Sequence, residues 1–533
     1  EIGMNLNLYC LNGKWIIVDL GMTFAGDYFP GIDLIFPDTK FIEERQEDLL
    51  GIVLTHGHDD HIGAVPYLWE KLRAPIYATP FTLELVRGKL IEAGLLGEVE
   101  LHEIPMGGSF SLGPFNLSYI ELAHSIAEGN ALKIDTKHGT IFHTGDWKLD
   151  DTPVYGKAIS TKGLKDIGNE GVLCMVGDST NVFNKSASGS EQSVFDGLDE
   201  IMVSQKNRVV ITTFASNVSR LDTIGKISIK HDRHLCLMGR SMHRIVSAAK
   251  KTGYLKDFPP ILNEVDINHL PKNKVLILCT GCQGEERAAL GRLARDDNKN
   301  FSLTEGDSVL FSSKMIPGNE TSIARVMNEL ALANINIITE KDAHIHVSGH
   351  PGQPELKDMY EWIKPQNAIP VHGEARHLKK HKLFAEELGV ANAVSPLNGD
   401  VIRIAPGRVQ KVDEVPSGRL VLDGDCVLPI ESDMIVERRR IMLHGHLSIV
   451  LLLDDEGAPL SLPVFIAKGI PGWEEKNNLF ELILDKVEEV LGTLHSKNLL
   501  DDKLIEEEVR RKVRRLLKNE IGKKPITEVR VMH

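Results

Sequence analysis

The most informative stretch of the chain is VLTHGHDDHIGAV, residues 53–65. Three histidines and two aspartates lie within six consecutive positions there, after an apolar run and before a segment with helical spacing. Imidazole and carboxylate are ligands that zinc and manganese accept. Alternate residues of an extended turn point the same way, so His56 and His58 can bind one ion while Asp60 and His61 reach a second. We expect Asp59 not to bind metal itself, but either to contact one of these ligands or to face solvent.

The composition is that of a soluble globular protein. The 533 residues exceed one ordinary core, so two to four domains are expected, and 42% of the residues are hydrophobic and 26% charged. No apolar run approaches the ~20 residues of a membrane span, and residues 1–10 lack the pattern of a secretory signal. Six scattered cysteines suit a reducing compartment. We therefore expect a cytoplasmic protein without membrane contact.

The net charge is −14, which argues against a protein that coats nucleic acid with its whole surface. It leaves open a nucleic-acid enzyme whose basic groups are confined to a channel and whose metal ions supply local positive charge.

The chain divides into five segments by its hydrophobic pattern. The first alternates short apolar runs with helical spacing, which predicts a layered α/β domain. The second has apolar strands that end in Gly, Ser or Thr, which is typical of a parallel sheet beside a cleft. Histidine-rich turns return in the third segment, and the fourth segment is a linker. The fifth segment is an αβ tail that starts with a hairpin over 437–467, turning at Asp455-Glu456-Gly457. The segments are residues 1–190, 191–344, 345–405, 406–435 and 436–533.

Three further positions offer metal ligands at the ends of predicted strands. His124 stands in AHS at 123–125, Asp146 ends HTGD at 143–146, and His372 lies in PVHGE at 370–374. Each alone would be a weak signal, because a single histidine is more often a surface or core residue. Together with the first motif they supply seven ligands, enough for two metal sites that share one carboxylate.

These seven residues occur in the order and contexts of the metallo-β-lactamase fold, which the chain resembles. The resemblance implies an αββα sandwich with two divalent metal ions at its edge. By that pattern His56, His58 and His124 hold one ion, and Asp60, His61 and His372 hold the other. Asp146 then bridges the two together with a water. We expect zinc, with manganese as the alternative, because both accept these ligands.

A long gap separates Asp146 from His372, and two motifs flank it. VGDSTN at 176–181 places Asp178 after an apolar strand, and HIHVSGHPG at 344–352 precedes the last ligand. This arrangement resembles the β-CASP nucleases, in which an inserted α/β domain closes over the active site. The resemblance implies that Asp178 orients His350 as a proton donor to the leaving oxygen. It also implies a phosphate site made by the remaining residues of the second motif, His346, Ser348 and Gly349, together with His350.

Nearly the whole chain resembles the bacterial ribonuclease J family. The stretches that carry the likeness are EIGMNLNLY, LTHGHDDHIGAVPYL, VGDSTN, TTFASNVSR (212–220), GCQGE (281–285), KMIPGNE (314–320) and HVSGH. The sequence departs from the pattern at Cys282, where a serine is expected, and in VFNKSASGSEQSV, which lacks a Pro-Gly. Neither departure touches a candidate ligand.

That resemblance gives the expected architecture and activity. It implies a metallo-β-lactamase sandwich in two parts, 1–190 and 345–405, with a β-CASP domain inserted at 191–344 and a small αβ domain at the C-terminus. The enzyme would hydrolyse single-stranded RNA, as a 5′-to-3′ exonuclease that prefers a 5′ monophosphate and as an endonuclease. A homodimer or homotetramer would form through the C-terminal domain. Further RNA or phosphate contacts are expected at Ser216, Asn217, Arg240, Ser241, Asn319 and Glu320.

Other interpretations remain open from the sequence alone. A tRNA 3′-end endonuclease lacks the insert and the HVSGH motif, and a penicillin hydrolase needs no such insert. A DNA-processing β-CASP nuclease and a catalytically silent binding protein share more of the pattern, although the complete ligand set argues against the latter. In the tail, RRKVRR at 510–515 can bind RNA, but helical spacing of its apolar neighbours favours a solvated face of an amphipathic helix.

Overall fold

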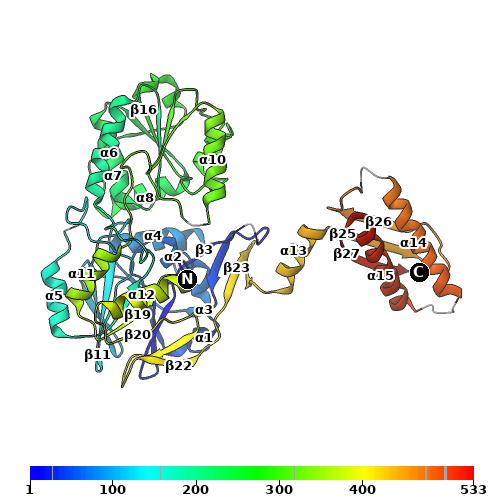
Figure 1. The fold of residues 1–533 in the computed structure, drawn as a ribbon, viewed down its shortest axis with the longest axis horizontal. Coiled ribbons are helices and arrows are strands. Elements are labelled where there is room, and N and C mark those ends of the chain that lie inside the picture. Colours follow the sequence, from blue (N-terminus) through cyan, green and yellow to red (C-terminus); the bar gives the residue numbers. More distant parts are fainter. Residues whose placement is uncertain (27, 157, 317, 455, 474–476, 497–500) are drawn as a thin grey trace. The chain divides into compact units, whose positions relative to one another are not determined.

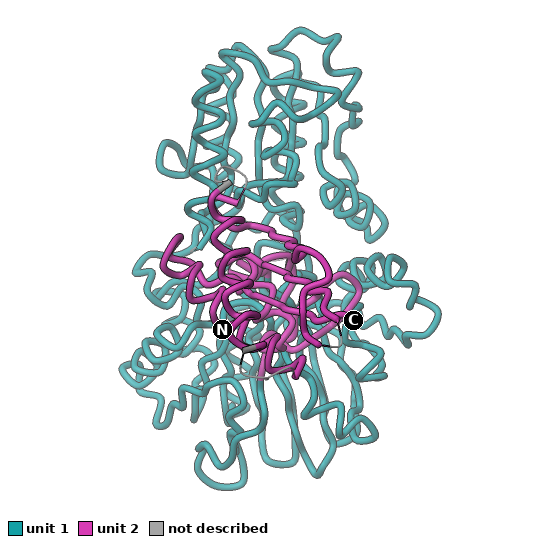
Figure 2. The backbone as a smooth tube through the Cα atoms, turned by 90° about the vertical axis from the view of Figure 1, so that its right-hand side faces the viewer, with its two compact units in different colours: residues 1–23, 36–417 teal, residues 24–35, 418–533 magenta. Residues whose placement is uncertain are grey.

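The structure is a computed structural model that describes residues 1–533 except 27, 157, 317, 455, 474–476 and 497–500. It contains two compact units (Figure 2): residues 1–23 with 36–417, and residues 24–35 with 418–533. Among the described helices, none is long and apolar enough to cross a membrane.

The first unit contains a sandwich of two sheets (Figure 1). One has the order β1-β2-β5-β6-β7, with bounds Asn7–Leu11, Lys14–Val18, Leu49–Val53, Ile76–Ala78 and Leu101–Glu103. The other has the order β20-β19-β12-β11-β10-β9-β8, with bounds Asn392–Ala393, Asn367–Val371, Val172–Asp178, Gly139–His143, Asn130–Thr136, Phe115–Glu121 and Ser109–Leu112. Their facing side chains form one buried core, in which Ile16, Val18 and Val53 meet Leu117, Leu132 and Ile134.

Helices cover the outer faces of this sandwich. Leu164 of α5, Met359 of α11 and Ala385 of α12 pack on Phe142 and Met175 of the larger sheet. Helix α4 contacts β6 and β7 of the smaller sheet. The layers are therefore helix, sheet, sheet, helix, which confirms the predicted αββα sandwich. The helices are α5 Thr161–Glu170, α11 Gln353–Ile363, α12 Ala375–Glu387 and α4 Pro80–Glu92.

A separate parallel sheet lies between β12 and β19 in the sequence. Its order is β15-β14-β16-β13-β17-β18, with bounds Ile261–Leu262, His234–Met238, Val275–Cys279, Val209–Thr212, Ser308–Phe311 and Asn336–Ile338. Residues alternate between its two faces: Val209 and Ile211 face the helices α6, α7 and α8, whereas Val210 faces α9 and α10. Both faces are buried, so the strands are almost wholly apolar, as the sequence predicts. The helices are α6 Glu191–Ser204, α7 Val218–Lys230, α8 Arg240–Lys251, α9 Ala289–Ala294 and α10 Glu320–Leu332.

Strands β12 and β19 pair directly in parallel, Asp178 opposite Val371, although the whole insert separates them in the sequence. The chain therefore leaves and re-enters the sandwich at one edge. This pairing places the ends of both strands, and hence Asp178 and His372, next to each other.

The second unit has a small three-stranded sheet of order β26-β25-β27 with two long helices against it. Its core contains Ile449, Ile483, Val509 and Val513. The predicted hairpin is present as β25 and β26, but its first residues are helical, because α13 ends only at His444. Asp455 of the predicted turn lies outside the described residues. The elements are β26 Val464–Lys468, β25 His446–Leu452, β27 Ile526–Met532, α13 Asp433–His444, α14 Asn477–Ser496 and α15 Asp502–Ile521.

A buried ion pair joins the helices of the insert. The guanidinium of Arg220, which has no exposed surface, donates from Nε to Glu191 Oε2 at 3.0 Å and from Nη2 to Glu191 Oε1 at 3.1 Å. It also donates to the carbonyl oxygens of Ser312 and Ile345. Removal of one member of such a pair leaves a buried charge without compensation.

We therefore predict that Arg220→Ala lowers the free energy of unfolding by about 3–5 kcal/mol, measured by urea denaturation followed by circular dichroism. The matched control is Arg325→Ala, because Arg325 pairs with Glu286 on the exposed surface of the same insert and such pairs contribute about 0–1 kcal/mol. Equal shifts of the two midpoints would contradict the assignment.

Candidate metal centre

The ends of five strands converge on one edge of the sandwich. His56 and His58 lie in the loop after β5, and Asp60 and His61 form the first turn of α2 (Asp59–Ile62). The turn packs against the chain after β2 so tightly that a Cβ on Gly21 would lie 1.6 Å from the carbonyl oxygen of Asp60. The other three ligand candidates follow strands of the larger sheet: His124 after β9, Asp146 after β11 and His372 after β19.

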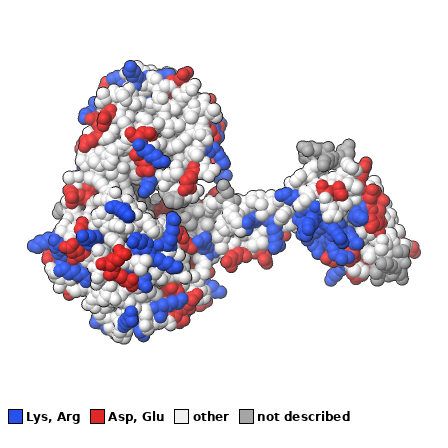
Figure 3. Space-filling model, in the orientation of Figure 1, with Lys and Arg blue, Asp and Glu red and all other residues white. Residues whose placement is uncertain are grey.

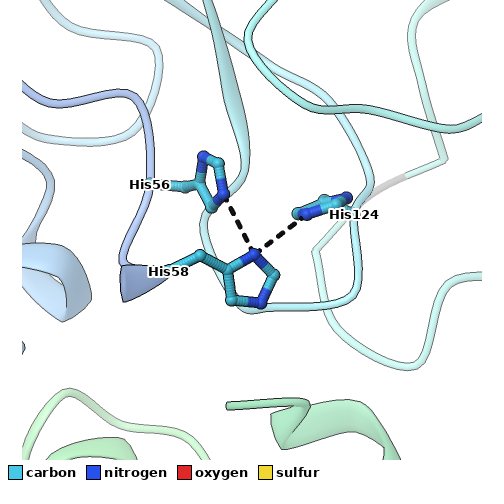
Figure 4. Close-up of side chains that lie close together, drawn as sticks. All are labelled: His56, His58 and His124. Atoms are coloured by element: carbon cyan, nitrogen blue, oxygen red, sulfur yellow. Dashed lines mark hydrogen bonds between the residues drawn. The ribbon is translucent and has the colours of Figure 1, made fainter. Parts of the chain in front are cut away.

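Three imidazoles meet at the first cluster (Figure 4). His58 Nδ1 lies 3.0 Å from His56 Nε2 and 3.0 Å from His124 Nε2. His124 Nδ1 lies 2.6 Å from the carbonyl oxygen of Gly349, to which it donates, so its Nε2 carries a lone pair. Burial lowers the pKa of His56 and His124 well below the usual range and that of His58 to about 4. Neutral imidazoles are the form that binds metal.

Asp146 stands at the centre of the second cluster. Its Oδ2 lies 3.1 Å from His61 Nε2 and 3.0 Å from His372 Nε2. The same oxygen lies 3.9 Å from His56 Nε2 and 3.8 Å from His124 Nε2, so it stands between both groups. Burial would raise the pKa of the Asp146 carboxyl, but His372 and His61 hold it well below its usual value. These distances bring together all seven predicted ligands, including Asp60, whose Oδ2 lies 3.3 Å from His372 Nε2.

These residues fit a divalent cation. Among the described residues, Asp146 Oδ1 is buried and has no hydrogen-bond partner, and the same holds for His372 Nδ1. A buried carboxylate oxygen without a donor is costly, and a cation among these ligands would satisfy it. The donor set of imidazole and carboxylate matches the preferences of zinc.

The structure adds one residue that the sequence reasoning missed. Asp19 ends the stretch KWIIVD and is buried, with Oδ2 2.7 Å from His61 Nδ1. Its Oδ1 accepts from the amide of Thr55 at 2.7 Å. The His61 Nδ1–H therefore points at Asp19 and Nε2 faces the cluster. An acidic residue directly after a buried apolar strand was the available signal.

Asp178 and His350 form a pair beside the cluster. His350 Nδ1 lies 2.8 Å from Asp178 Oδ2, and it lies 4.0 Å from Asp146 Oδ2. Thr180 donates to Asp178 Oδ1 from its amide and its hydroxyl, which fixes the carboxylate. Burial would lower the pKa of His350, but Asp178 raises it above the usual value. A fixed carboxylate that favours the imidazolium is the arrangement of a proton donor.

Known families match most of the chain. The Metallo-beta-lactamase superfamily model matches residues 5–91, the Ribonuclease J beta-CASP domain 206–330, the Zn-dependent metallo-hydrolase RNA specificity domain 336–396 and the Ribonuclease J C-terminal domain 433–533. A protein named Ribonuclease J from Sinorhizobium meliloti is 39% identical over 99% of this chain and 95% of its own. The chain belongs to the ribonuclease J family. It is accordingly a metallo-hydrolase, and the histidine and aspartate cluster is consistent with the metal site of such enzymes.

Other relatives agree with this assignment. Ribonuclease J of Corynebacterium glutamicum is 36% identical over 99% of this chain and 73% of its own. A crystal structure of a protein of unknown function from Enterococcus faecalis aligns with a TM-score of 0.51 over 79% of this chain and 97% of its own, at 16% identity. That likeness concerns the fold alone.

Two residues of HVSGH contact the site: Gly349 accepts from His124, and His350 lies 4.0 Å from Asp146. The hydroxyl of Ser348 accepts from Asn181 Nδ2 at 2.7 Å and from the amide of His350 at 3.1 Å. A Cβ on Gly349 would lie 2.5 Å from Ser125 Oγ and 2.9 Å from His124 Cε1, so no side chain fits there. His346 is mostly buried, its Nδ1 has no partner among the described residues, and burial lowers its pKa to about 3.

Six predicted RNA contacts lie in the insert, and no described hydrogen bond or ion pair links them to the metal cluster. Asn217 caps α7: its Oδ1 accepts from the amide of Arg220, and its Nδ2 donates to Glu191. Ser216 precedes it half-buried, and Arg240 and Ser241 begin α8. Asn319 precedes α10 and donates to Gln283, and Glu320 accepts from the amide of Gly318. Pro317 of the same motif lies outside the described residues.

The contact of Asp19 with His61 yields a prediction. Asp19→Asn removes the carboxylate that orients His61, so the affinity for zinc should fall about 10–100-fold, measured by competition with a chelator. The matched control is Asp59→Asn in the same motif, because Asp59 is exposed and pairs with Lys89. Unchanged zinc affinity in the Asp19 variant would show that this carboxylate does not support the metal site.

Proposed function

We propose that the chain is a ribonuclease with 5′-to-3′ exonuclease activity that prefers 5′-monophosphate ends and with endonuclease activity, acting in RNA processing and mRNA decay. The observation that carries this is the Asp178–His350 pair, 4.0 Å from the oxygen shared by the metal-ligand clusters. A proton donor beside a metal cluster suits hydrolysis of a phosphodiester, whose leaving oxygen needs a proton.

The metal ligands divide between two divalent ions, zinc in preference to manganese. In this proposal His56, His58 and His124 hold one ion, Asp60, His61 and His372 hold the other, and Asp146 serves both. Bound ions would lower the pKa of an attacking water and neutralise charge on the phosphoryl oxygens. The central position of Asp146 Oδ2, 3.0–3.9 Å from four imidazole nitrogens, supports the shared role.

His350 gives its proton to the leaving 3′ oxygen, and Asp178 holds it for that transfer. Because Asp178 accepts from Nδ1, the other ring nitrogen is left to donate. The carboxylate of Asp178 is itself fixed by Thr180 and carries no exposed surface, so it positions the imidazole without contacting the substrate.

A phosphate pocket would explain the exonuclease activity. If the 5′ monophosphate docks one nucleotide from the metal site, only the terminal bond is cut, and a triphosphate fits badly. Ser348, Gly349 and His346 are the proposed contacts, supported by the Nδ1 of His346, which has no hydrogen-bond partner among the described residues. Ser216, Asn217, Arg240 and Ser241 would extend the pocket, and Asn319 and Glu320 would line the RNA path.

The remaining features follow from the same proposal. The substrate is single-stranded RNA, the enzyme acts in the cytoplasm, and it assembles into a homodimer or homotetramer through the C-terminal domain. The proposed boundaries are a metallo-β-lactamase domain at 1–190 and 345–405, a β-CASP domain at 191–344, a linker at 406–435 and the C-terminal domain at 436–533.

The test of this function uses one RNA labelled at its 5′ end with either a monophosphate or a triphosphate. We expect the zinc-loaded protein to release labelled mononucleotide from the monophosphate RNA alone. The Asp60→Ala, His61→Ala variant should release none, because it lacks two ligands. The products are separated by gel electrophoresis.

Longer labelled fragments from both RNAs would show the endonuclease activity. If no labelled mononucleotide appeared from the monophosphate RNA beside them, the phosphate pocket would be contradicted. Absence of cleavage in either RNA, with zinc bound, would contradict the ribonuclease proposal as a whole.

A second prediction isolates the proton donor. His350→Ala should lower kcat on RNA by about 10²–10⁴-fold but should have little effect on a p-nitrophenyl phosphodiester, whose leaving group needs no proton. The control is His344→Ala in the same segment, because His344 contacts Ser193 away from the metal ligands. An equal loss on both substrates would assign His350 to metal binding instead of proton transfer.

A further inference from the structure

The second unit contains a cavity that the proposed catalytic chemistry does not use. It has a volume of about 810 Å³ and is lined by α13, α15 and the segment from Gly522 to Thr527. Five of its lining residues are basic: Arg440, Arg510, Arg514, Lys518 and Lys524. Two are acidic, Asp433 and Glu437, so the lining carries net positive charge.

The cavity is positively charged because Lys and Arg are concentrated around it, and not because this part of the chain contains an excess of them. Residues 433–533 contain 17 Lys and Arg against 18 Asp and Glu, and the whole chain has a net charge of −14. Lys and Arg nevertheless gather on one face of this part of the molecule (Figure 3). On α15 the acidic residues 506–508 stand in the first turns and the basic residues 510–518 follow. The helix dipole favours a cation only in the last turn, where Lys518 stands, so it does not explain the whole row.

Most of these cations form no ion pair among the described residues. Arg510 donates to both carboxylate oxygens of Glu507. In the described part of the chain, no ion pair or side-chain hydrogen bond engages Arg440, Arg514, Lys518 or Lys524, and Arg514 Nε is buried without a partner. Like charges held together repel each other, and a buried donor without an acceptor is costly. An anion in the cavity would relieve both.

The spacing of the row identifies the kind of anion. Arg510, Arg514 and Lys518 are four residues apart, so they share one face of α15 and follow each other about 6 Å apart along its axis. The residues that precede them, Val509, Val513 and Leu517, are buried in the core, which fixes the orientation of the helix. A regular row of cations matches the repeating phosphates of a nucleic-acid strand better than one compact anion. Arginine in particular binds phosphate with two parallel donors.

We propose that this cavity, which forms a groove between α13 and α15, binds the sugar–phosphate backbone of single-stranded RNA outside the catalytic site. The inference rests on the proposed ribonuclease function and deepens it. The described lining residues include one ring, the imidazole of His444, and no Phe, Tyr or Trp. Contacts with phosphates therefore dominate, and these are independent of sequence. The row that sequence alone favoured as a solvated helix face thus becomes a substrate contact.

The test compares two triple variants of the full-length chain. The groove variant is Arg514→Gln, Lys518→Gln, Lys524→Gln. The matched control is Arg511→Gln, Lys512→Gln, Arg515→Gln, which removes the same charge from exposed positions of the same helix that do not line the cavity. Both are placed in the Asp60→Ala, His61→Ala background to prevent cleavage. The affinity for a single-stranded RNA of about 30 nucleotides is measured between about 50 and 200 mM salt.

The groove variant should bind more weakly, and its plot of log affinity against log salt should flatten by about 2, since each lost phosphate contact in a single strand contributes about 0.7 to the slope. The control should keep the slope of the parent. In the cleavage-competent background, the groove variant should still cut a 5′-monophosphorylated trinucleotide at the parental rate, because so short a strand makes its contacts at the catalytic site.

An unchanged slope in the groove variant, or equal flattening in the control, would overturn the inference. So would a change of sedimenting mass with RNA affinity intact, because the groove would then bind protein. If the parent protein cuts no RNA, the proposed function is contradicted. If the parent cuts RNA but the groove variant keeps the parental salt slope, only this inference is contradicted.

Discussion

The rest of the active site depends on the position of one oxygen atom, Oδ2 of Asp146. Four imidazole nitrogens surround it at 3.0–3.9 Å, and they come from two sheets and three strand ends. So many buried nitrogen and oxygen ligand atoms close together are unfavourable unless a cation binds among them. The orphaned Oδ1 of the same residue points to the same need. The fold brings the ligands together, and the cation that they imply would in turn hold these strand ends in place.

The insert is joined to this centre by strand pairing. Because β12 and β19 are neighbours in the sheet, Asp178 and His372 follow adjacent strands although the insert lies between them in the sequence. The last residues before re-entry, Ser348 to His350, then reach the cluster: Gly349 accepts from His124, and His350 contacts Asp178. A change in the position of the insert would therefore act on His124, a candidate metal ligand, and on His350, the proposed proton donor, together.

The sequence predicted the sandwich, the parallel sheet and the grouping of the seven ligand candidates, because these follow from local patterns and motif spacing. It missed Asp19, since a lone aspartate after a strand has no distinctive spacing. The side chain of Asn217, a predicted RNA contact, donates to Glu191 and accepts from the amide of Arg220. The contact with Glu191 depends on tertiary packing, which no local sequence pattern reveals. The amphipathic helix predicted around residues 510–515 agrees with the structure, in which Val509 and Val513 are buried and Arg511, Lys512 and Arg515 are exposed. The cavity beside it depends on α13, which the sequence reasoning had partly assigned to a hairpin.

The proposed chemistry requires two metal ions that share Asp146. The most direct measurement is anomalous diffraction at the zinc edge from crystals of the zinc-loaded protein. Two peaks are predicted, one among His56, His58 and His124 and one among Asp60, His61 and His372, with Asp146 between them. A single peak, or peaks elsewhere in the chain, would contradict the account.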